Sequence, residues 1–189
     1  MYMFSCGHGH IRPAILVIAI LAFALTVSSP ACAGETYISA NGGMFSPGAD
    51  YPSDYATGLA GGLSYILVNE YAGFEFGLNG YTSSSDTYDE DIVSLGLEML
   101  VHFHKTDSTF QPFIALGLAR YRTTYTFGSS EENYTGGGAV FKLGARLYLS
   151  DKVFLGAYYK KLVNEVDMTP FKVDLGGDFI FGELGIVAF

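Results

Sequence analysis

The sequence predicts an all-β fold, a meander of eight antiparallel strands that closes into an up-and-down barrel. After Gly34, apolar and polar residues alternate with a period of two along most of the chain, which places them on opposite faces of β-strands. Long polar connections alternate with short ones, as expected when successive turns of a meander lie at opposite ends of the sheet. No stretch in this part of the chain shows the periodicity of an amphipathic helix.

Composition and charge restrict the class of protein. The chain has 189 residues, of which 49% are hydrophobic and 15% charged, and its formal net charge is -9. This length fits one ordinary domain, and the low charge content with many aromatic residues argues against disorder. The 10 Lys and Arg residues are scattered singly. Because phosphate binding needs a basic stripe, nucleic acid is excluded as a partner.

Residues 1–33 have the three parts of a cleavable signal peptide. Arg12 lies near the front, an apolar core follows in residues 14–27, and the small-residue site Ala31-Cys32-Ala33 comes last, so we expect Sec-type export and cleavage after Ala33. The core is shorter than the roughly 18 apolar residues that a helix needs to span a bilayer. Retention as a membrane anchor is therefore the weaker alternative.

Processing as a lipoprotein at Cys32 is a second alternative, but it requires Leu or a similar residue three positions upstream, where this chain has Ser29. Both cysteines, Cys6 and Cys32, belong to the segment that we expect to be removed. The mature domain, residues 34–189, then contains no thiol and no disulfide. Its stability has to come from backbone pairing and packing.

The alternation defines eight expected strands. They lie, in chain order, within residues 38–44, 59–67, 72–79, 92–104, 114–118, 140–149, 153–159 and about 172–189. In the clearest, the apolar row is Val93, Leu95, Leu97, Met99, Val101 and Phe103, and the opposite row is Ser94, Gly96, Glu98, Leu100, His102 and His104. The long connections are expected at 46–54, 82–90, 127–136 and 164–170, and the short ones at 68–70, 104–109 and 150–152.

Period two alone does not say whether the apolar rows face the inside or the outside, but three features favour lipid outside. The polar rows contain Gly, Ser and Asn with few charges, which suits a narrow interior better than a water-facing surface. The apolar rows are long enough to cover a belt of about 25 Å. Aromatic residues gather toward strand ends, where interfacial girdles lie: Tyr81, Tyr121, Tyr125, Phe127, Tyr159 and Phe171. A transmembrane sheet must also close, because hydrocarbon satisfies no backbone group. A secreted soluble barrel is the opposite alternative.

The signal segment, the eight-strand meander and the final Phe189 resemble the small outer-membrane β-barrels of Gram-negative bacteria, the OmpA-transmembrane and OmpX-like group. The resemblance implies a bacterial outer-membrane location, with outer-membrane lipid and lipopolysaccharide as surroundings. It also implies that Phe189, Val187 and Phe181 belong to a C-terminal signal read by the barrel-assembly machinery. Glu183 and Gly185 interrupt that apolar row.

Five charged residues fall on the expected interior rows: Glu75, Glu98, Lys142, Arg146 and Lys160. Because eight strands leave an interior just wide enough for side chains, we expect these charges to form an ion-pair network that plugs the barrel. In particular, we expect Glu98 to pair with a basic residue. A small gated pore is the alternative.

His102 and His104 are the residues that most resemble a chemical site. Neither has a third ligand at a suitable spacing, so no metal and no cofactor is expected. Lipid A deacylases are also outer-membrane barrels and use a His and Ser pair, but Ser94 lies about 26 Å from His102 along the same strand. We therefore expect solvated histidines at the short-turn end and no enzyme activity, with a lipid-modifying enzyme as the alternative.

Arg120 and Arg122 fall on the expected lipid face, toward the long loops. Arg can grip lipopolysaccharide phosphate in a fork, or extend to the water surface, and the two are compatible. The long loops are rich in Asp and Glu, which we expect to be solvated. Taken together, the residues predict a structural or surface-interaction role, in membrane integrity or in adhesion to an extracellular partner through the loops.

Overall fold

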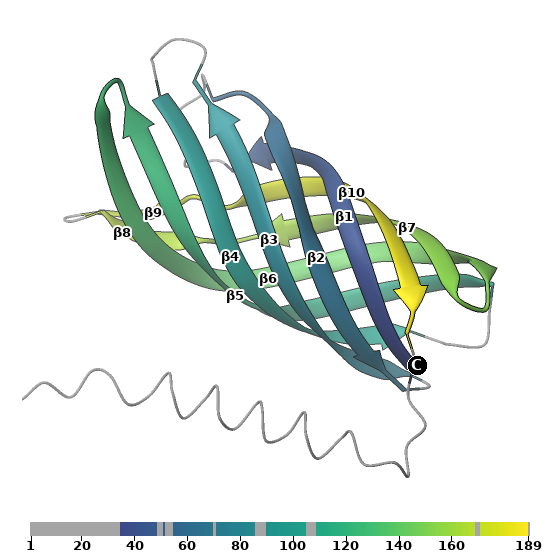
Figure 1. Cartoon of the computed structure of the whole chain (residues 1–189). Coiled ribbons are helices and arrows are strands. Elements are labelled where there is room, and N and C mark those ends of the chain that lie inside the picture. Colours follow the sequence, from purple (N-terminus) through teal and green to yellow (C-terminus); the bar gives the residue numbers. More distant parts are fainter. Residues whose placement is uncertain are drawn as a thin grey trace, which may run out of the picture. The chain divides into compact units, whose positions relative to one another are not determined.

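The computed structural model describes residues 35–48, 51, 55–69, 71–85, 90–104, 109–168 and 171–188, and side chains are not described at 167, 168, 171 and 172. All regular structure in these residues is β-strand (Figure 1). None of the described residues forms a helix that is long and apolar enough to cross a membrane. The predicted signal peptide and Phe189 lie outside the described residues, so the expectations about them stay predictions.

The strands follow the chain in order, and each pairs antiparallel with its neighbours. Their bounds are β1 Glu35–Pro47, β2 Gly58–Val68, β3 Ala72–Ser84, β4 Glu90–His104, β5 Phe110–Phe127, β6 Ser130–Ser150, β7 Val153–Leu162, β8 Glu165–Met168, β9 Phe171–Asp174 and β10 Gly177–Val187. β7 and β8 are two parts of one strand position, as are β9 and β10, and β1 pairs with β10. The predicted closed eight-stranded antiparallel barrel is confirmed.

The pairing register fixes the inclination of the strands. A row of paired residues that starts at Gly136 on β6 goes once round the barrel and returns to β6 at Arg146, ten residues further along, through Tyr121, Gly96, Asn79, Gly62, Asn41, Glu183 and Gly156. This stagger over eight strands inclines them by about 40° to the barrel axis. In the same row glycine stands beside most of the large interior side chains, as a narrow lumen requires.

The apolar rows face outward, as predicted. Leu95 is 57% exposed and Leu143 49% exposed on the outer face, whereas Glu98 and Arg146 are each 1% exposed inside. A water-soluble barrel would bury these leucines. The surface of the barrel is therefore made for contact with hydrocarbon.

The structure corrects the prediction of a long polar loop at residues 127–136. β5 continues to Phe127 and β6 begins at Ser130, so only a two-residue turn remains. Gly128 takes a positive φ of 55° in this turn, a conformation that glycine adopts without a steric penalty. Polar residues extend the strands here because this part of the hairpin needs no apolar face.

Two further corrections concern aromatic residues. Tyr81 and Tyr121, expected in an interfacial girdle, are buried in the interior. In β10 the row with Phe181, Glu183 and Val187 faces inward. The apolar row that Glu183 and Gly185 interrupt is therefore the interior row and not the lipid-facing one. The outward row is Ile180, Gly182, Leu184 and Ile186. Both rows of β10 contain apolar residues, so alternation alone did not separate them.

Candidate functional site

The interior of the barrel is filled in layers, and the layer at the short-turn end is aromatic and aliphatic. Tyr37 and Phe154 meet edge to face with their ring centroids 5.5 Å apart, and Tyr148 packs against both. Ile66 and Val68 complete this cluster. These side chains close the lumen toward the short turns.

Glu75 on β3 is the centre of the first interior ion-pair group. Its Oε1 accepts a hydrogen bond from Lys142 Nζ at 2.5 Å and another from Ser64 Oγ at 2.7 Å. Its Oε2 contacts Nε2 of His102 on the neighbouring strand β4. Since a buried carboxylate is stable only when it is paired and hydrogen-bonded, this arrangement satisfies both oxygens.

The structure corrects the expectation that His102 and His104 are solvated. His102 is fully buried, with its ring 5.3 Å from that of Phe113, and His104 is 8% exposed with Nε2 3.2 Å from the carbonyl oxygen of Asn69. The sequence did place both on the interior row. Their burial follows from Glu75 and Phe113, which come from other strands.

A second group is built around Glu98 on β4. Oε1 of Glu98 accepts hydrogen bonds from Lys160 Nζ at 2.6 Å and from the Tyr121 hydroxyl. The Lys160 ammonium also lies 4.2 Å from the centroid of the Phe179 ring, a favourable cation–π position. Glu98 thus has the basic partner inside the barrel that the sequence led us to expect.

Arg146 on β6 forms the third group with Glu183 of β10, which sequence reasoning missed. Arg146 Nε donates to Glu183 Oε2 at 3.0 Å, and Ser39 Oγ donates to Glu183 Oε1 at 2.7 Å. The guanidinium carbon lies 4.5 Å from the Phe113 ring centroid. The available signal was the position of Glu183, which is two and four residues from the buried aromatic residues Phe181 and Phe179 on one strand face.

All five predicted interior residues therefore lie inside the barrel, but they make three separate groups instead of one chain. Three carboxylates and three fixed cations balance in charge. Each of the six charged side chains is no more than 3% exposed. These side chains are thus shielded from water, and the lumen is closed at this level.

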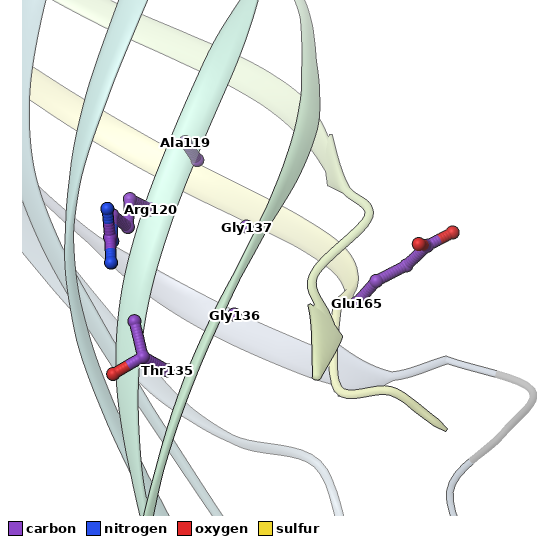
Figure 2. A pocket seen from close by; sticks show the side chains of 6 residues that line it. All are labelled: Ala119, Arg120, Thr135, Gly136, Gly137 and Glu165. Carbon is purple, nitrogen blue, oxygen red and sulfur yellow. The ribbon is translucent and has the colours of Figure 1, made fainter. Parts of the chain in front are cut away.

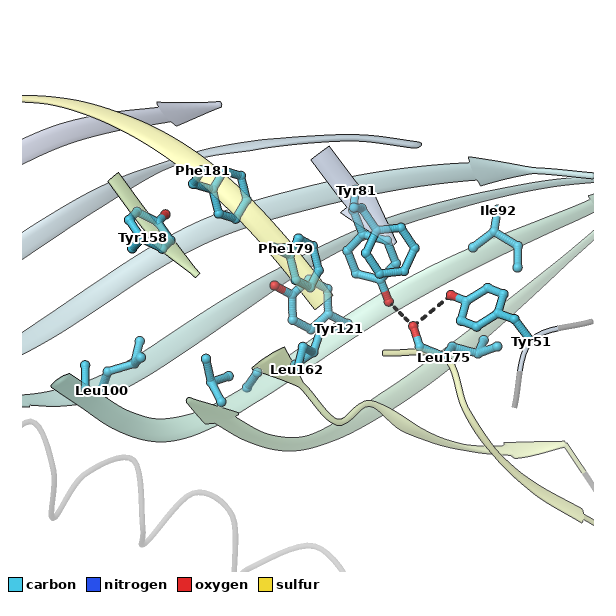
Figure 3. Close-up of a cluster of buried hydrophobic side chains, with 14 of the residues drawn as sticks. Tyr51, Tyr81, Ile92, Leu100, Tyr121, Tyr158, Leu162, Leu175, Phe179 and Phe181 are labelled. Carbon is cyan, nitrogen blue, oxygen red and sulfur yellow. Dashed lines mark hydrogen bonds between the residues drawn. The ribbon is translucent and has the colours of Figure 1, made fainter. Parts of the chain in front are cut away.

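The interior near the long loops is again aromatic. Phe45, Tyr81 and Phe179 pack together, with centroid distances of 4.3 Å and 4.8 Å from Phe45 to the other two rings. Above them, the hydroxyls of Tyr51 and Tyr81 both donate to the carbonyl oxygen of Leu175 (Figure 3). Burial raises the pKa of the Tyr51 phenol, which keeps it protonated as a donor. Tyr51, between β1 and β2, covers the second end of the lumen together with Tyr81.

The outer face of β5 marks where the apolar belt ends. Its outward residues from Phe110 to Leu118 are apolar, and Arg120 and Arg122 follow, both exposed. Ten residues at about 3.3 Å rise and 40° inclination cover about 25 Å along the axis, the height of a lipid-facing belt. Arg120 therefore lies at the rim of the belt, on the long-loop side.

A recess of about 290 Å³ lies beside Arg120 (Figure 2). It is lined by Ala119, Arg120, Thr135, Gly136, Gly137 and Glu165, from β5, β6 and β8. Figure 2 shows Arg120 on one side of the two glycines and Glu165 on the other, directed away from it. Arg122 Nε donates to Asn133 Oδ1 at 3.2 Å, so the second arginine is held against β6.

Ser94 and His102, the pair weighed for catalysis, do not meet in the structure. Ser94 Oγ lies 2.8 Å from Thr123 Oγ1, and His102 contacts Glu75 at a different level of the barrel. No group of three or more His, Cys, Asp or Glu residues in the described part of the chain could hold a metal ion. The features with functional potential are the plugged lumen and the charged outer rim.

A closed barrel with a lipid-facing belt and a polar, plugged interior defines an integral membrane β-barrel protein of the outer-membrane type. The family model of the outer membrane protein beta-barrel domain matches residues 18–179, and this chain belongs to that family. The protein is accordingly located in the bacterial outer membrane, with the long-loop end outside the cell and the short turns in the periplasm. The resemblance stated from the sequence is confirmed.

Solved structures with the same fold are distant in sequence. OprG from Pseudomonas aeruginosa has a TM-score of 0.60 at 15% identity, covering 82% of this chain and 96% of that one. Ail of Yersinia pestis, solved with the heparin analogue sucrose octasulfate, has a TM-score of 0.57 at 15% identity, covering 82% and 99%. Neisserial surface protein A has a TM-score of 0.55 at 20% identity, covering 82% and 97%. Comparison with curated proteins gives no match.

Proposed function

We propose that this protein is a non-conducting outer-membrane barrel with a structural or surface-interaction role, and that it is not an enzyme. The observation that carries the proposal is the plugged lumen. Three buried ion-pair groups lie between an aromatic layer at the short-turn end and a second one under Tyr51. Side chains that hold one another in this way support a lumen that is closed to hydrated ions.

Among the described residues, the β5–β6 hairpin above the rim offers a surface to a partner. β5 and β6 stay paired from the level of Arg120 to the turn between Phe127 and Ser130. The tip of the hairpin therefore lies about 18 Å above Arg120 along the barrel axis. Phe127 is 54% exposed at this tip. A rigid, paired hairpin presents such a residue without the ordering entropy that a flexible loop would lose on binding.

The charge of this outer end indicates the chemistry of the partner. The described residues here are mainly acidic: Glu90, Asp91, Glu131, Glu132 and Glu165, with Arg120 and Arg122 at the rim. Ail was crystallised with a heparin analogue, but here the hairpin above the rim carries carboxylates, which repel sulfate groups, and the two arginines lie below it at the rim. We therefore favour adhesion to a neutral or cationic protein surface.

Adherence of bacteria carrying a shortened hairpin tests the surface role. Thr123 and Tyr134 are register partners, so replacing residues 124–133 with Asn-Gly keeps the strand pairing in a two-residue turn. We expect normal heat-modifiable gel mobility but loss of adherence to cultured cells. The variant Glu131→Gln/Glu132→Gln keeps the hairpin and should lose only part of the adherence. Undiminished adherence of the shortened variant contradicts the proposal.

The pore alternative is tested by reconstitution in planar bilayers. The plugged interior predicts no discrete conductance for the folded protein. Discrete conductance steps that appear with the purified protein and not with a mock preparation would contradict our proposal and support a gated pore. Against the enzyme alternative, the one Ser and His pair that we weighed does not meet: Ser94 contacts Thr123, and His102 contacts Glu75.

A further inference from the structure

We propose that the recess beside Arg120 binds a phosphate group of lipopolysaccharide in the outer leaflet. This inference rests on the outer-membrane location and does not depend on an extracellular protein partner. At the recess, the exposed residues Arg120, Thr135 and Glu165 come from the outer face of β5, β6 and β8, and Arg120 is its cationic residue and Glu165 its acidic one. Its level, about 25 Å above the apolar residues at the short-turn end, is that of the outer headgroups.

Arg120 is available for such a ligand. Within the described residues, no side chain or backbone group forms a hydrogen bond or ion pair with its guanidinium. The cation therefore follows the apolar row of β5 without a protein partner. A phosphate group can accept two parallel hydrogen bonds from such a guanidinium, which is the most favourable pairing open to an arginine at the edge of the lipid. Glu165 lies on the far side of the glycines, and its side chain is directed away from Arg120 (Figure 2).

The backbone around Arg120 is shaped to admit a headgroup. Gly137 is the register partner of Arg120, and Thr135 is the partner of Arg122. Gly136 is buried, so Gly137 is the residue that leaves the floor of the recess beside Arg120 without a side chain, and the exposed Thr135 adds a hydroxyl on its wall. A phosphate oxygen can approach this floor while the guanidinium binds from the side.

Another cation at the same rim offers a matched control. Lys161 on β7 is exposed like Arg120, but its Nζ lies 3.2 Å from Asp178 Oδ1, and Asp178 also accepts from the Tyr159 hydroxyl. Its charge is already compensated. A lipid attracted only by the general charge of the rim would not distinguish between Lys161 and Arg120.

The test measures how lipopolysaccharide stabilises the purified barrel in a neutral detergent. A ligand that binds only the folded state raises the unfolding temperature by an amount that grows with the logarithm of its concentration above Kd, and the heat-modifiable gel band reports unfolding. For Arg120→Ala, the lipopolysaccharide concentration needed to reach the same shift as in the wild type should rise about tenfold, the effect of losing one charge-assisted contact. Arg120→Lys should retain part of the affinity, and Lys161→Ala should behave like the wild type.

Three ligands separate the sources of phosphate. Intact lipopolysaccharide should shift the unfolding temperature, dephosphorylated lipopolysaccharide should shift it much less, and inorganic phosphate at the same concentration should have no effect. The proposal is overturned if lipopolysaccharide shifts the unfolding temperature of Arg120→Ala as much as that of the wild type, or if Lys161→Ala loses as much of the shift as Arg120→Ala. It is also overturned if dephosphorylated lipopolysaccharide or inorganic phosphate gives the wild type as large a shift as intact lipopolysaccharide. Heat-modifiable gel mobility in the absence of lipopolysaccharide shows that each variant is folded. These outcomes are independent of conductance and adherence.

Discussion

Lys160 Nζ lies 2.6 Å from Glu98 Oε1, and this contact joins β7 to β4 across the lumen. Lys142 and Glu75 join β6 to β3 in the same way. In each pair the strands are three positions apart around the barrel. The ion pairs therefore link the first half of the meander to the second half, in addition to the backbone pairing at its closure.

Breaking the Glu98 pair should destabilise the barrel strongly. Glu98→Ala leaves the Lys160 ammonium buried without its carboxylate, and we expect the free energy of unfolding to fall by about 3–5 kcal/mol. The double variant Glu98→Leu/Lys160→Met removes both charges and should recover most of that loss. Urea titration in lipid vesicles measures all three. A double variant no more stable than Glu98→Ala contradicts the role of the pair.

Glu75 should be more important for stability than His102. Glu75→Ala removes the partner of Lys142 as well as that of His102, with an expected loss of about 3–5 kcal/mol. His102→Phe removes one hydrogen bond but keeps an aromatic ring beside Phe113, so about 1–2 kcal/mol is expected. The same urea titration ranks the two variants, and the reverse order would argue against Glu75 as the centre of its group.

Gly96 is required by its neighbour Tyr121. A Cβ at Gly96 would lie 2.5 Å from the Tyr121 side chain and 2.6 Å from the Arg120 carbonyl oxygen. Gly96→Ala should therefore cost about 1–3 kcal/mol through overpacking. Gly42→Ala is the control, because nothing lies within 4 Å of that Cβ. If both variants keep the wild-type melting temperature on heat-modifiable gels, Gly96 is not tightly packed against Tyr121.

Depth in the lipid belt should determine the effect of a new charge on β6. Leu143 pairs with Ile114, near the middle of the apolar row of β5, whereas Leu149 lies close to the turn at 151–152. We expect Leu143→Arg to lower the free energy of unfolding by about 2–4 kcal/mol and Leu149→Arg by about 0–1 kcal/mol. Unfolding in vesicles gives the comparison, and equal effects would place the belt elsewhere.

Much of the fold was predictable because period two is a local property. Alternation located the strands, and the small polar residues opposite the leucines indicated an interior that is narrow and mostly uncharged. The face of β10 was not predictable, since Phe179 and Phe181 inside are as apolar as Ile180 and Leu184 outside. The hairpin above Arg120 was missed because its Ser, Glu, Asn and Gly residues are typical of loops.

The sequence by itself determined a closed barrel with apolar rows outward, and it placed Glu75, Glu98, Lys142, Arg146 and Lys160 on the interior rows. Only the tertiary structure decided which acid meets which base, the burial of His102, and the position of Arg120 beside a recess. The physical reason is the stagger of the strands. Contacts across the lumen depend on how far each strand is displaced along its neighbours, and that displacement is a sum over the whole closed sheet that no single segment encodes.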